Sequence, residues 1–270
     1  MSIAATRRSL IVAGATGAIG REVVVQAVSD ARFGRVVALS RRTLTPNQFA
    51  DTFPGIDAAK AAEKLSVVGV DWEALTVSLT PAAGCHRPAS VTVPDESFPE
   101  GVRAAFANID CAAMCMGTTK KDAGSAEAFV RVDFDYVVTF ISLLRRFSPT
   151  SVTRYVQISS SGASATSYFL YMKTKGRADE AAVAAGFPHV VIMRPGLLGR
   201  KDKARFGERI LSVFLPVMPV ERVAAATMVA ICDATGTTSE GGTVAAWENG
   251  KIHVVTPGWA PQPSSAAAKS

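Results

Sequence analysis

Short apolar runs alternate along the chain with longer segments in which apolar residues recur every three or four positions. The apolar runs predict strands at Ser9–Ala13, Arg35–Leu39, Lys64–Val70, Asp110–Met116, Arg154–Ile158 and His189–Met193. The helical spacing predicts helices at Ala18–Ser29, Ser125–Phe147 and Ser167–Ala185. Because strands and helices alternate, the sequence predicts βαβ units with right-handed crossovers, and thus an α/β fold built on a doubly wound parallel sheet.

Two segments without a clear period interrupt this alternation. Thr43–Ala62 and Thr76–Glu100 are rich in Pro, Ala, Thr and Gly, so we expect surface loops or insertions there. The chain after about residue 200 predicts a small C-terminal helical extension, with helices at Phe206–Leu215 and Arg222–Ala234 and a late strand at Lys251–Val255. Pro257–Ser270 has low complexity and predicts a disordered tail. We expect one domain over residues 1–256, with its substrate side from about residue 197.

The composition is that of a globular protein. Of the 270 residues, 48% are hydrophobic and 19% charged, and no apolar run approaches a membrane span. The sequence shows no signal-peptide pattern, and its four cysteines do not suggest a disulfide framework. The three histidines are too far apart for zinc-ligand spacing, so we expect no metal. We expect a cytoplasmic protein, with the nucleus or an association with the mitochondrion as alternatives.

The charge balance is basic, with 29 Lys and Arg against 23 Asp and Glu, a net charge of +6. Such an excess is compatible with a nucleic-acid partner. However, the arginine pairs at 7–8, 41–42 and 145–146 are scattered, and no recognition module is visible. We therefore expect no nucleic-acid partner.

Three glycines, Gly14, Gly17 and Gly20, separate the first predicted strand from the first predicted helix. Glycines at this spacing let the backbone turn sharply and approach a pyrophosphate, and the helix N-terminus supplies free N–H groups and a positive dipole. A tight strand-to-helix turn without a ligand is the alternative. The pattern predicts a dinucleotide site made by Gly14, Ala15, Thr16, Gly17, Ala18, Ile19 and Gly20.

The end of the second predicted strand distinguishes the two nicotinamide dinucleotides. An acidic residue there would bind the ribose hydroxyls of NAD. This chain has Ser40, Arg41 and Arg42 instead, and a guanidinium can bind a 2′-phosphate with paired hydrogen bonds. NADP(H) is favoured over NAD(H), with solvated arginines as the alternative. Asp71, after the third strand, would accept the adenine amino group or cap a helix.

Tyr171 and Lys175 form a Y-x-x-x-K pair on the helix after the fifth predicted strand. Residues four apart share a helix face, so both side chains are expected to point into the cofactor site. A neighbouring ammonium favours the phenolate form of a tyrosine, which suits it to acid–base work. Ser160 and Ser161, with Ser159 close behind, are candidates to donate to a substrate carbonyl oxygen; a polar loop with a helix cap is the alternative.

Together, these motifs resemble the short-chain dehydrogenase/reductase superfamily, and more closely its atypical branch, that of the HIV-Tat-interacting oxidoreductase-like protein. The most specific matching segments are Cys115–Thr119 (CMGTT), Phe129–Tyr136 (FVRVDFDY) and Arg194–Gly196 (RPG). In order and spacing, the matching segments cover most of residues 9 to 200.

The resemblance implies a Rossmann domain that binds NADPH and transfers hydride to or from a carbonyl or alcohol carbon. An NADPH-binding regulatory or scaffold protein with little turnover is the alternative. The resemblance also implies that Met116 and Gly117 lie beneath the adenosine and ribose of the cofactor. It further implies that Leu198 approaches the carboxamide and that Arg205 adds a phosphate contact. We consider three kinds of partner: a small-molecule substrate, another protein, and a second copy of this chain in a homodimer. Asp133 and Tyr136 also fall in a matching segment, and we expect them to be helix-face residues that brace the fourth and fifth strands.

Overall fold

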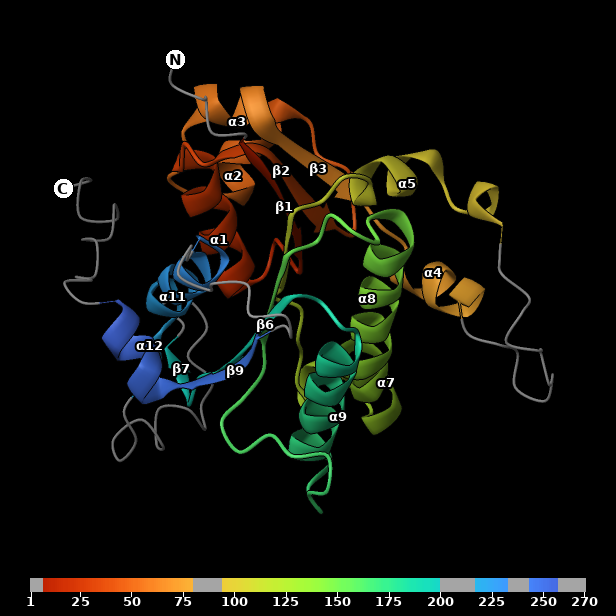
Figure 1. Ribbon diagram of the computed structural model, residues 1–270, viewed down its shortest axis with the longest axis vertical. Helices are drawn as coiled ribbons and strands as arrows, with labels where there is room; N and C mark the ends of the chain where they lie inside the picture. The colour runs from red at the N-terminus through yellow and green to blue at the C-terminus, as the bar shows by residue number, and fades with distance from the viewer. Residues whose placement is uncertain (1–6, 80–93, 200–216, 233–242, 257–270) are drawn as a thin grey trace.

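The computed structural model describes residues 7–79, 94–199, 217–232 and 243–256, and its centre is a parallel sheet of seven strands (Figure 1). The strands run in the order β3-β2-β1-β4-β5-β6-β9. Their bounds are β1 Arg8–Ala13, β2 Phe33–Ser40, β3 Leu65–Gly69, β4 Cys111–Met114, β5 Arg154–Ile158, β6 His189–Arg194 and β9 Thr243–Glu248. Because the chain winds outward from β1 in both directions, the predicted doubly wound parallel α/β fold is confirmed.

Helices cover both faces of the sheet, as Figure 1 shows. One face carries α1 Ala18–Ser29, α2 Phe49–Thr52, α3 Ala58–Lys64, α11 Val220–Cys232 and α12 Asn249–Val255. The other carries α4 Trp72–Leu79, α5 Glu100–Phe106, α8 Tyr136–Phe147 and α9 Leu170–Ala184. Two short helices, α6 Lys120–Ala123 and α7 Ala126–Val130, join β4 to α8, and a separate strand pair consists of β7 Leu198–Gly199 and β8 Met218–Pro219.

The two covered faces explain why the strands read as continuous apolar runs. In β1, Leu10 and Val12 belong to the core on the α1 side, whereas Ile11 and Ala13 belong to the core on the α8 side. All four side chains are fully buried, so no position in the run is left for a polar residue.

The helix predicted over Ser125–Phe147 is interrupted by a π-helical turn. Ser125 caps α7 by accepting a hydrogen bond from Ala128 N (3.0 Å), and residues Arg131–Asp135 then form the π turn η3 before α8 begins. A π turn adds a residue to the helix and is frequent at functional sites. Asp133, in the middle of this turn, is fully buried.

Both segments expected to be loops contain helices. Thr43–Ala62 includes the short turn η1 Pro46–Gln48, α2 and part of α3, because the buried rings of Phe49 and Phe53 pack edge to face with centroids 6.5 Å apart. In Thr76–Glu100, Thr76 to Leu79 close α4, and a turn η2 follows at Asp95–Ser97. Residues 80–93 of that segment lie outside the described residues.

The strand predicted at Lys251–Val255 is wrong, because these residues belong to α12 and the strand is β9. β9 pairs in parallel with β6 along its whole length and buries Trp247. The helix predicted at Arg222–Ala234 corresponds to α11. The helix predicted at residues 206–215 and the tail predicted at 257–270 lie outside the described residues.

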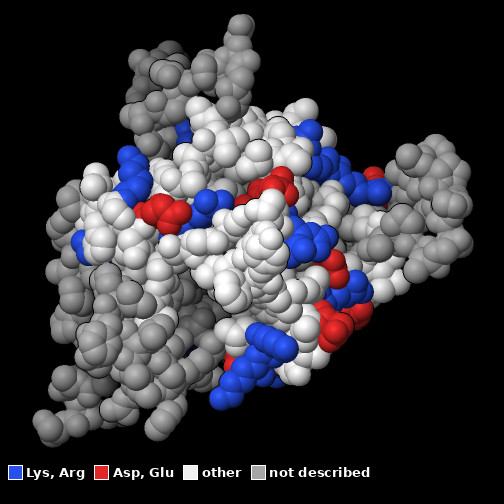
Figure 2. Space-filling view, turned by 90° about the horizontal axis from the view of Figure 1, so that it is seen from below, with Lys and Arg blue, Asp and Glu red and all other residues white. Residues whose placement is uncertain are grey.

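The described surface carries charges of both signs. On the face seen in Figure 2, basic and acidic side chains are interspersed between uncharged residues. Across the described ranges, no helix is long and apolar enough to cross a membrane. In the same ranges, no three His, Cys, Asp or Glu residues come together to hold a metal ion.

Replacement of Phe140 tests the core on the α8 side. This ring is fully buried and packs against Trp72, Phe106 and Tyr155. Phe140→Ala should lower the free energy of unfolding by about 3–5 kcal/mol, because it leaves a cavity. Val77→Ala, at a side chain 60% exposed on α4, should change it by less than about 0.5 kcal/mol. Urea unfolding measures both, and equal effects would contradict this description of the core.

Candidate active site

The glycine loop lies against the loop that follows β4. Gly14 has a φ of 70°, and a Cβ atom there would lie 2.6 Å from Met116 N. A Cβ atom on Gly20 would collide with the Gly14 carbonyl oxygen. Gly17 is the N-cap of α1 and provides no side-chain cap, so the first-turn N–H groups can receive an anion. The loop therefore fits the close backbone approach that a pyrophosphate requires.

The arginine pair follows β2 at the same edge of the sheet. Arg41 and Arg42 are exposed, and neither has an acidic partner among the described residues. The Arg42 N–H donates to Ser40 Oγ (3.3 Å). Asp71 caps α4 by accepting from Ala74 N (3.0 Å), so the capping role is present, and the adenine contact stays a prediction.

Lys175 is held in a buried ion pair. Its Nζ lies 2.7 Å from Asp133 Oδ1, with the two side chains 8% and 0% exposed. The other carboxylate oxygen of Asp133 accepts a hydrogen bond from Thr118 N (2.8 Å). A Cβ atom on Gly117 would lie 3.1 Å from Lys175 Nζ and 3.3 Å from Asp133 Oδ1. The loop after β4 therefore lies directly on this ion pair.

Tyr171 lies one helical turn before Lys175 and is 37% exposed. Its ring stacks on the buried Phe129 ring, with centroids 5.6 Å apart and an angle of 22° between the planes. Its hydroxyl forms no hydrogen bond with the described part of the chain. The stacked ring fixes the tyrosine, and its hydroxyl stays available to a ligand.

The three serines after β5 have different surroundings. Ser159 is buried, and its Oγ donates to Asp179 Oδ2 (2.9 Å), which commits this hydroxyl to the structure. Ser160 is half-buried, with Oγ 3.5 Å from the Ser161 carbonyl oxygen. Ser161 is exposed, and its N–H donates to Pro195 O (2.9 Å). Ser160 and Ser161 therefore stay the candidates.

Cysteine chemistry is disfavoured next to this site. Burial raises the pKa of the Cys111 thiol and of the Cys115 thiol to about 12 in each case. Both thiols are protonated at neutral pH and are poor nucleophiles.

Two residues expected to contact the cofactor come later in the chain. Leu198 lies in the short strand β7, beside Met218. Arg205 lies outside the described residues.

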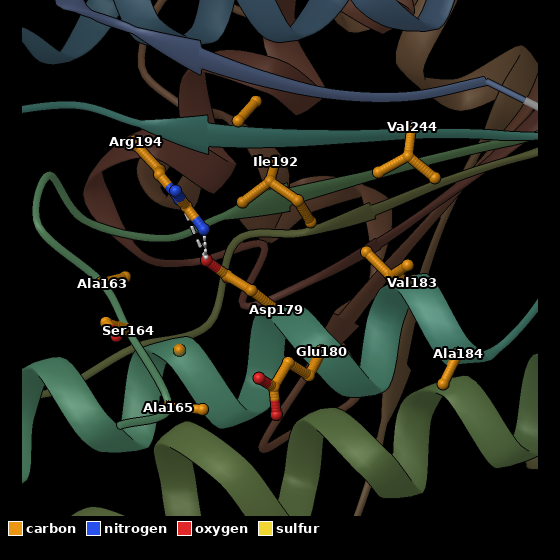
Figure 3. A pocket seen from close by; sticks show the side chains of 12 residues that line it. Ala163, Ser164, Ala165, Asp179, Glu180, Val183, Ala184, Ile192, Arg194 and Val244 are labelled. Carbon is orange, nitrogen blue, oxygen red and sulfur yellow. Dashed lines mark hydrogen bonds and ion pairs between the residues drawn. The ribbon is translucent and has the colours of Figure 1, made fainter. Parts of the chain in front are cut away.

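A cavity of about 460 Å³ lies between α9 and the strands β6 and β9 (Figure 3). Apolar side chains of α9, β6 and β9 line it, including Val183, Ile192 and Val244. At its inner end, Arg194 donates from Nε (3.1 Å) and Nη2 (3.0 Å) to Asp179 Oδ2. None of the residues predicted for the cofactor or catalysis lines this cavity.

Two buried carboxylates were not predicted as parts of the site. Asp133 was expected to brace the fourth and fifth strands from its helix face, but it binds Lys175 and the loop after β4. Its position four residues after Phe129 and four before Val137, on an apolar helix face, was a signal that could have indicated it. Asp179 joins β5, α9 and β6 by accepting from Gln157, Ser159 and Arg194.

Tyr136 was expected to brace the fourth and fifth strands from its helix face, but the contacts of its hydroxyl and its ring are to α4. Its hydroxyl donates to Glu73 Oε2 (3.0 Å), and its ring stacks on Trp72 at 6.1 Å. Arg131 also donates to Glu73, and these hydrogen bonds lower the pKa of the Glu73 carboxyl. The outer side of the π turn is thus tied to α4.

Known proteins resemble this chain in sequence, and solved structures resemble it in fold. The Candida albicans protein named FMP52, mitochondrial, is 30% identical over 204 residues, which are 75% of this chain and 73% of that protein. Rat HTATIP2 is 28% identical over 213 residues, covering 78% and 72% of the two chains. No family model matches the sequence.

Among solved structures, a short-chain dehydrogenase from Burkholderia cenocepacia J2315 in complex with NADP superposes with a TM-score of 0.59. It is 14% identical and covers 92% of this chain and 91% of its own, so it supports the fold alone.

The parallel sheet, the glycine loop and the Y-x-x-x-K helix define a Rossmann protein of the short-chain dehydrogenase/reductase class. The sequence likeness is more specific. The chain belongs to the atypical branch of that class that includes FMP52 and HTATIP2.

The contact between Gly20 and the Gly14 carbonyl gives a test of the loop. Gly20→Ala should lower the free energy of unfolding by about 1–3 kcal/mol, because the added methyl group forces α1 away from the loop. Gly101→Ala, in α5 with no atom within 4 Å of the new Cβ, should leave stability equal or slightly higher. If both variants unfold at the same urea concentration, the tight turn is not present.

Proposed function

We propose that this protein is an NADP(H)-dependent oxidoreductase that transfers hydride between the nicotinamide and a carbonyl or alcohol carbon. One observation carries the proposal. The loop after β4 touches the glycine loop at Gly14 and the buried lysine at Lys175, through Met116 and Gly117. A dinucleotide with its pyrophosphate on α1 would therefore extend along this loop toward Tyr171.

A nicotinamide bound there would supply the hydride. The chain's own residues orient the reactants and handle the proton. Lys175 would donate hydrogen bonds to the nicotinamide ribose, and Ser160 or Ser161 would donate to the substrate oxygen. In the reductive direction, the Tyr171 hydroxyl would give its proton to that oxygen as the carbon receives hydride, and in the oxidative direction it would take the proton back. The phenolate left after reduction regains its proton from solvent, to which Tyr171 is exposed.

The preference for NADP over NAD rests on the arginine pair. Arg41 and Arg42 are exposed beyond β2 with no acidic partner among the described residues, so both are available to a 2′-phosphate.

We further propose one domain over residues 1–256, because the described parts of the C-terminal region extend the same sheet through β9 and pack α11 against α1.

The name of the Candida albicans relative, which includes the word mitochondrial, favours the mitochondrion as the compartment of this protein over the cytoplasm expected from the sequence. Fractionation of cells that express the tagged full chain distinguishes the two.

Cofactor titration tests the arginine pair. Arg41→Ala combined with Arg42→Ala should raise the Kd for NADPH about 10–100-fold, because charge-assisted hydrogen bonds to the phosphate are lost. The Kd for NADH should change little. Lys60→Ala, which removes one exposed positive charge from α3, serves as the control and should affect neither Kd. An equal loss of NADH and NADPH binding in the double variant would contradict the assignment.

Tyrosine replacement tests the chemistry. Tyr171→Phe should reduce NADPH oxidation with a panel of aldehydes, ketones and quinones by about 100-fold or more, while the Kd for NADPH changes little. Tyr168→Phe removes a fully exposed hydroxyl three residues earlier and should retain activity. Tight NADPH binding by the wild-type protein without turnover of any compound would instead indicate a regulatory NADPH-binding protein.

A further inference from the structure

Strand β9 leaves one edge of the sheet open. Within the described residues it pairs with β6 alone, in an unbroken register from Thr243 to Glu248. Thr243 N donates to Pro188 O on the β6 side (2.8 Å). Because backbone groups alternate between the two edges of a strand, those of Val244 and Ala246 point away from the sheet. No described residue forms a hydrogen bond with these outward groups.

The opposite edge of the sheet, at β3, is covered. Leu44 N donates to Val67 O (3.4 Å). Thr43 Oγ1 accepts a hydrogen bond from Gly69 N (3.0 Å). An uncovered edge strand can pair with another chain, and proteins commonly protect such an edge with lysine, proline or a bulge. Strand β9 (TVAAWE) contains no lysine, no proline and no shift in register, so its edge is open to strand addition.

The cavity between α9 and the strands β6 and β9 opens beside this edge (Figure 3). Val244 and Ala246 line it from β9, and Val183 lines it from α9. Val183 is 42% exposed and Val244 is 56% exposed, although both side chains are apolar. A strand added to β9 would direct alternate side chains toward α9. Apolar side chains at these positions would cover both valines.

The charged side chains around the cavity leave a negative balance. Asp179 and Glu180 line the cavity, and Arg194 is the single basic side chain among the described residues that do so. The Arg194 charge is already balanced, because its guanidinium donates twice to Asp179 Oδ2. Glu180 is exposed. Glu248, whose side chain is 52% exposed, lies two residues after Ala246 and thus on the same face of β9. The cavity is therefore complementary to a positive charge.

We propose that the β9 edge and this cavity bind an extended segment of a partner protein, with large apolar side chains at alternate positions flanked by lysine or arginine. The segment would add to the sheet as a further strand and form hydrogen bonds with Val244 and Ala246. Its basic side chains would approach Glu180 and Glu248. None of the residues predicted for the cofactor or catalysis lines this cavity, so the proposal does not depend on hydride transfer.

A second copy of this chain is less complementary to the same edge. A two-fold contact of β9 with the β9 of another copy brings the same surface together from both partners. Glu180 and Glu248 of both copies would then lie at one interface, where like charges oppose association. A basic segment meets no such repulsion, so charge complementarity favours the partner protein as the occupant.

Binding of synthetic peptides to the full-length protein tests the proposal. The peptide KTLTLTK, blocked at both ends, places its leucines and lysines on one face of a strand. It should bind at least about tenfold more tightly than ETLTLTE, whose charges are reversed. It should also bind at least about tenfold more tightly than the same peptide N-methylated at both leucines and the central threonine, because N-methylation removes the donors that a strand needs.

Isothermal titration calorimetry measures the three Kd values. Equal affinities for the three peptides would overturn the proposal. A Kd for KTLTLTK above about 1 mM would overturn it as well, because so weak a contact has no selectivity.

Variants of the protein locate the binding surface. Ala246→Pro removes an outward N–H and keeps the hydrogen bonds to β6, so it should abolish binding of KTLTLTK. Glu180→Gln should weaken this binding about two- to fivefold. Glu100→Gln, at an exposed glutamate of α5, is the matched control and should leave the Kd unchanged. Circular dichroism establishes whether each variant is folded, and Glu180→Gln gives the answer if Ala246→Pro is not.

Two results would contradict this assignment of the edge. One is an unchanged Kd for KTLTLTK in folded Ala246→Pro, or in Glu180→Gln. The other is a wild-type dimer that Ala246→Pro dissociates, measured by analytical ultracentrifugation, which would assign the edge to a second copy of this chain.

Discussion

The buried ion pair between Asp133 and Lys175 is the constraint to which the other features of the site adjust. Two charges in a protein interior are stable only when each has its partner at close range and the remaining polar atoms are satisfied. The 2.7 Å separation places each charge beside its partner, and Thr118 N donates to the second oxygen of the carboxylate. Because Gly117 has no side chain, the loop after β4 can lie on the pair.

The helix that carries Lys175 is held by a second buried carboxylate. Asp179, one turn further along α9, accepts hydrogen bonds from Gln157 and Ser159 of the β5 end and from Arg194 of β6. The two aspartate contacts tie α9 to the π turn on one side and to the sheet on the other. Tyr171, stacked on Phe129, is thus presented by a helix with little freedom to shift. Such preorganisation is what the proposed hydride transfer would require of Tyr171 as proton donor and of Lys175 as ribose anchor.

Much of the fold could be predicted from the sequence, because a parallel sheet covered on both faces produces apolar runs that are easy to recognise. Strand β5 and helix α1 agree with their predicted bounds. The strand predicted at Lys251–Val255 failed because a short apolar run does not distinguish an edge strand from a short helix. The π turn could not be predicted, since its extra residue leaves the apolar spacing of the long segment almost unchanged.

The candidate site could be proposed from the sequence where a motif within one element indicates it, and not where contacts between distant elements do. The glycine loop and the Tyr171–Lys175 pair follow from spacing within one element. The partner of Lys175 lies 42 positions earlier in the chain (175 − 133), on a different helix, and no local pattern connects the two. Ser159 likewise could be separated from Ser160 and Ser161 only by its hydrogen bond to Asp179.

A crystal structure of the NADPH complex is the most direct test of the central claim, which is that α9 presents Tyr171 and an Asp133-bound Lys175 to a nicotinamide. The account predicts that Lys175 keeps its contact with Asp133 while donating to a hydroxyl of the nicotinamide ribose, with the Tyr171 hydroxyl facing the same side of the nicotinamide ring. A nicotinamide bound away from α9, or a Lys175 that leaves Asp133 to reach it, would contradict the account.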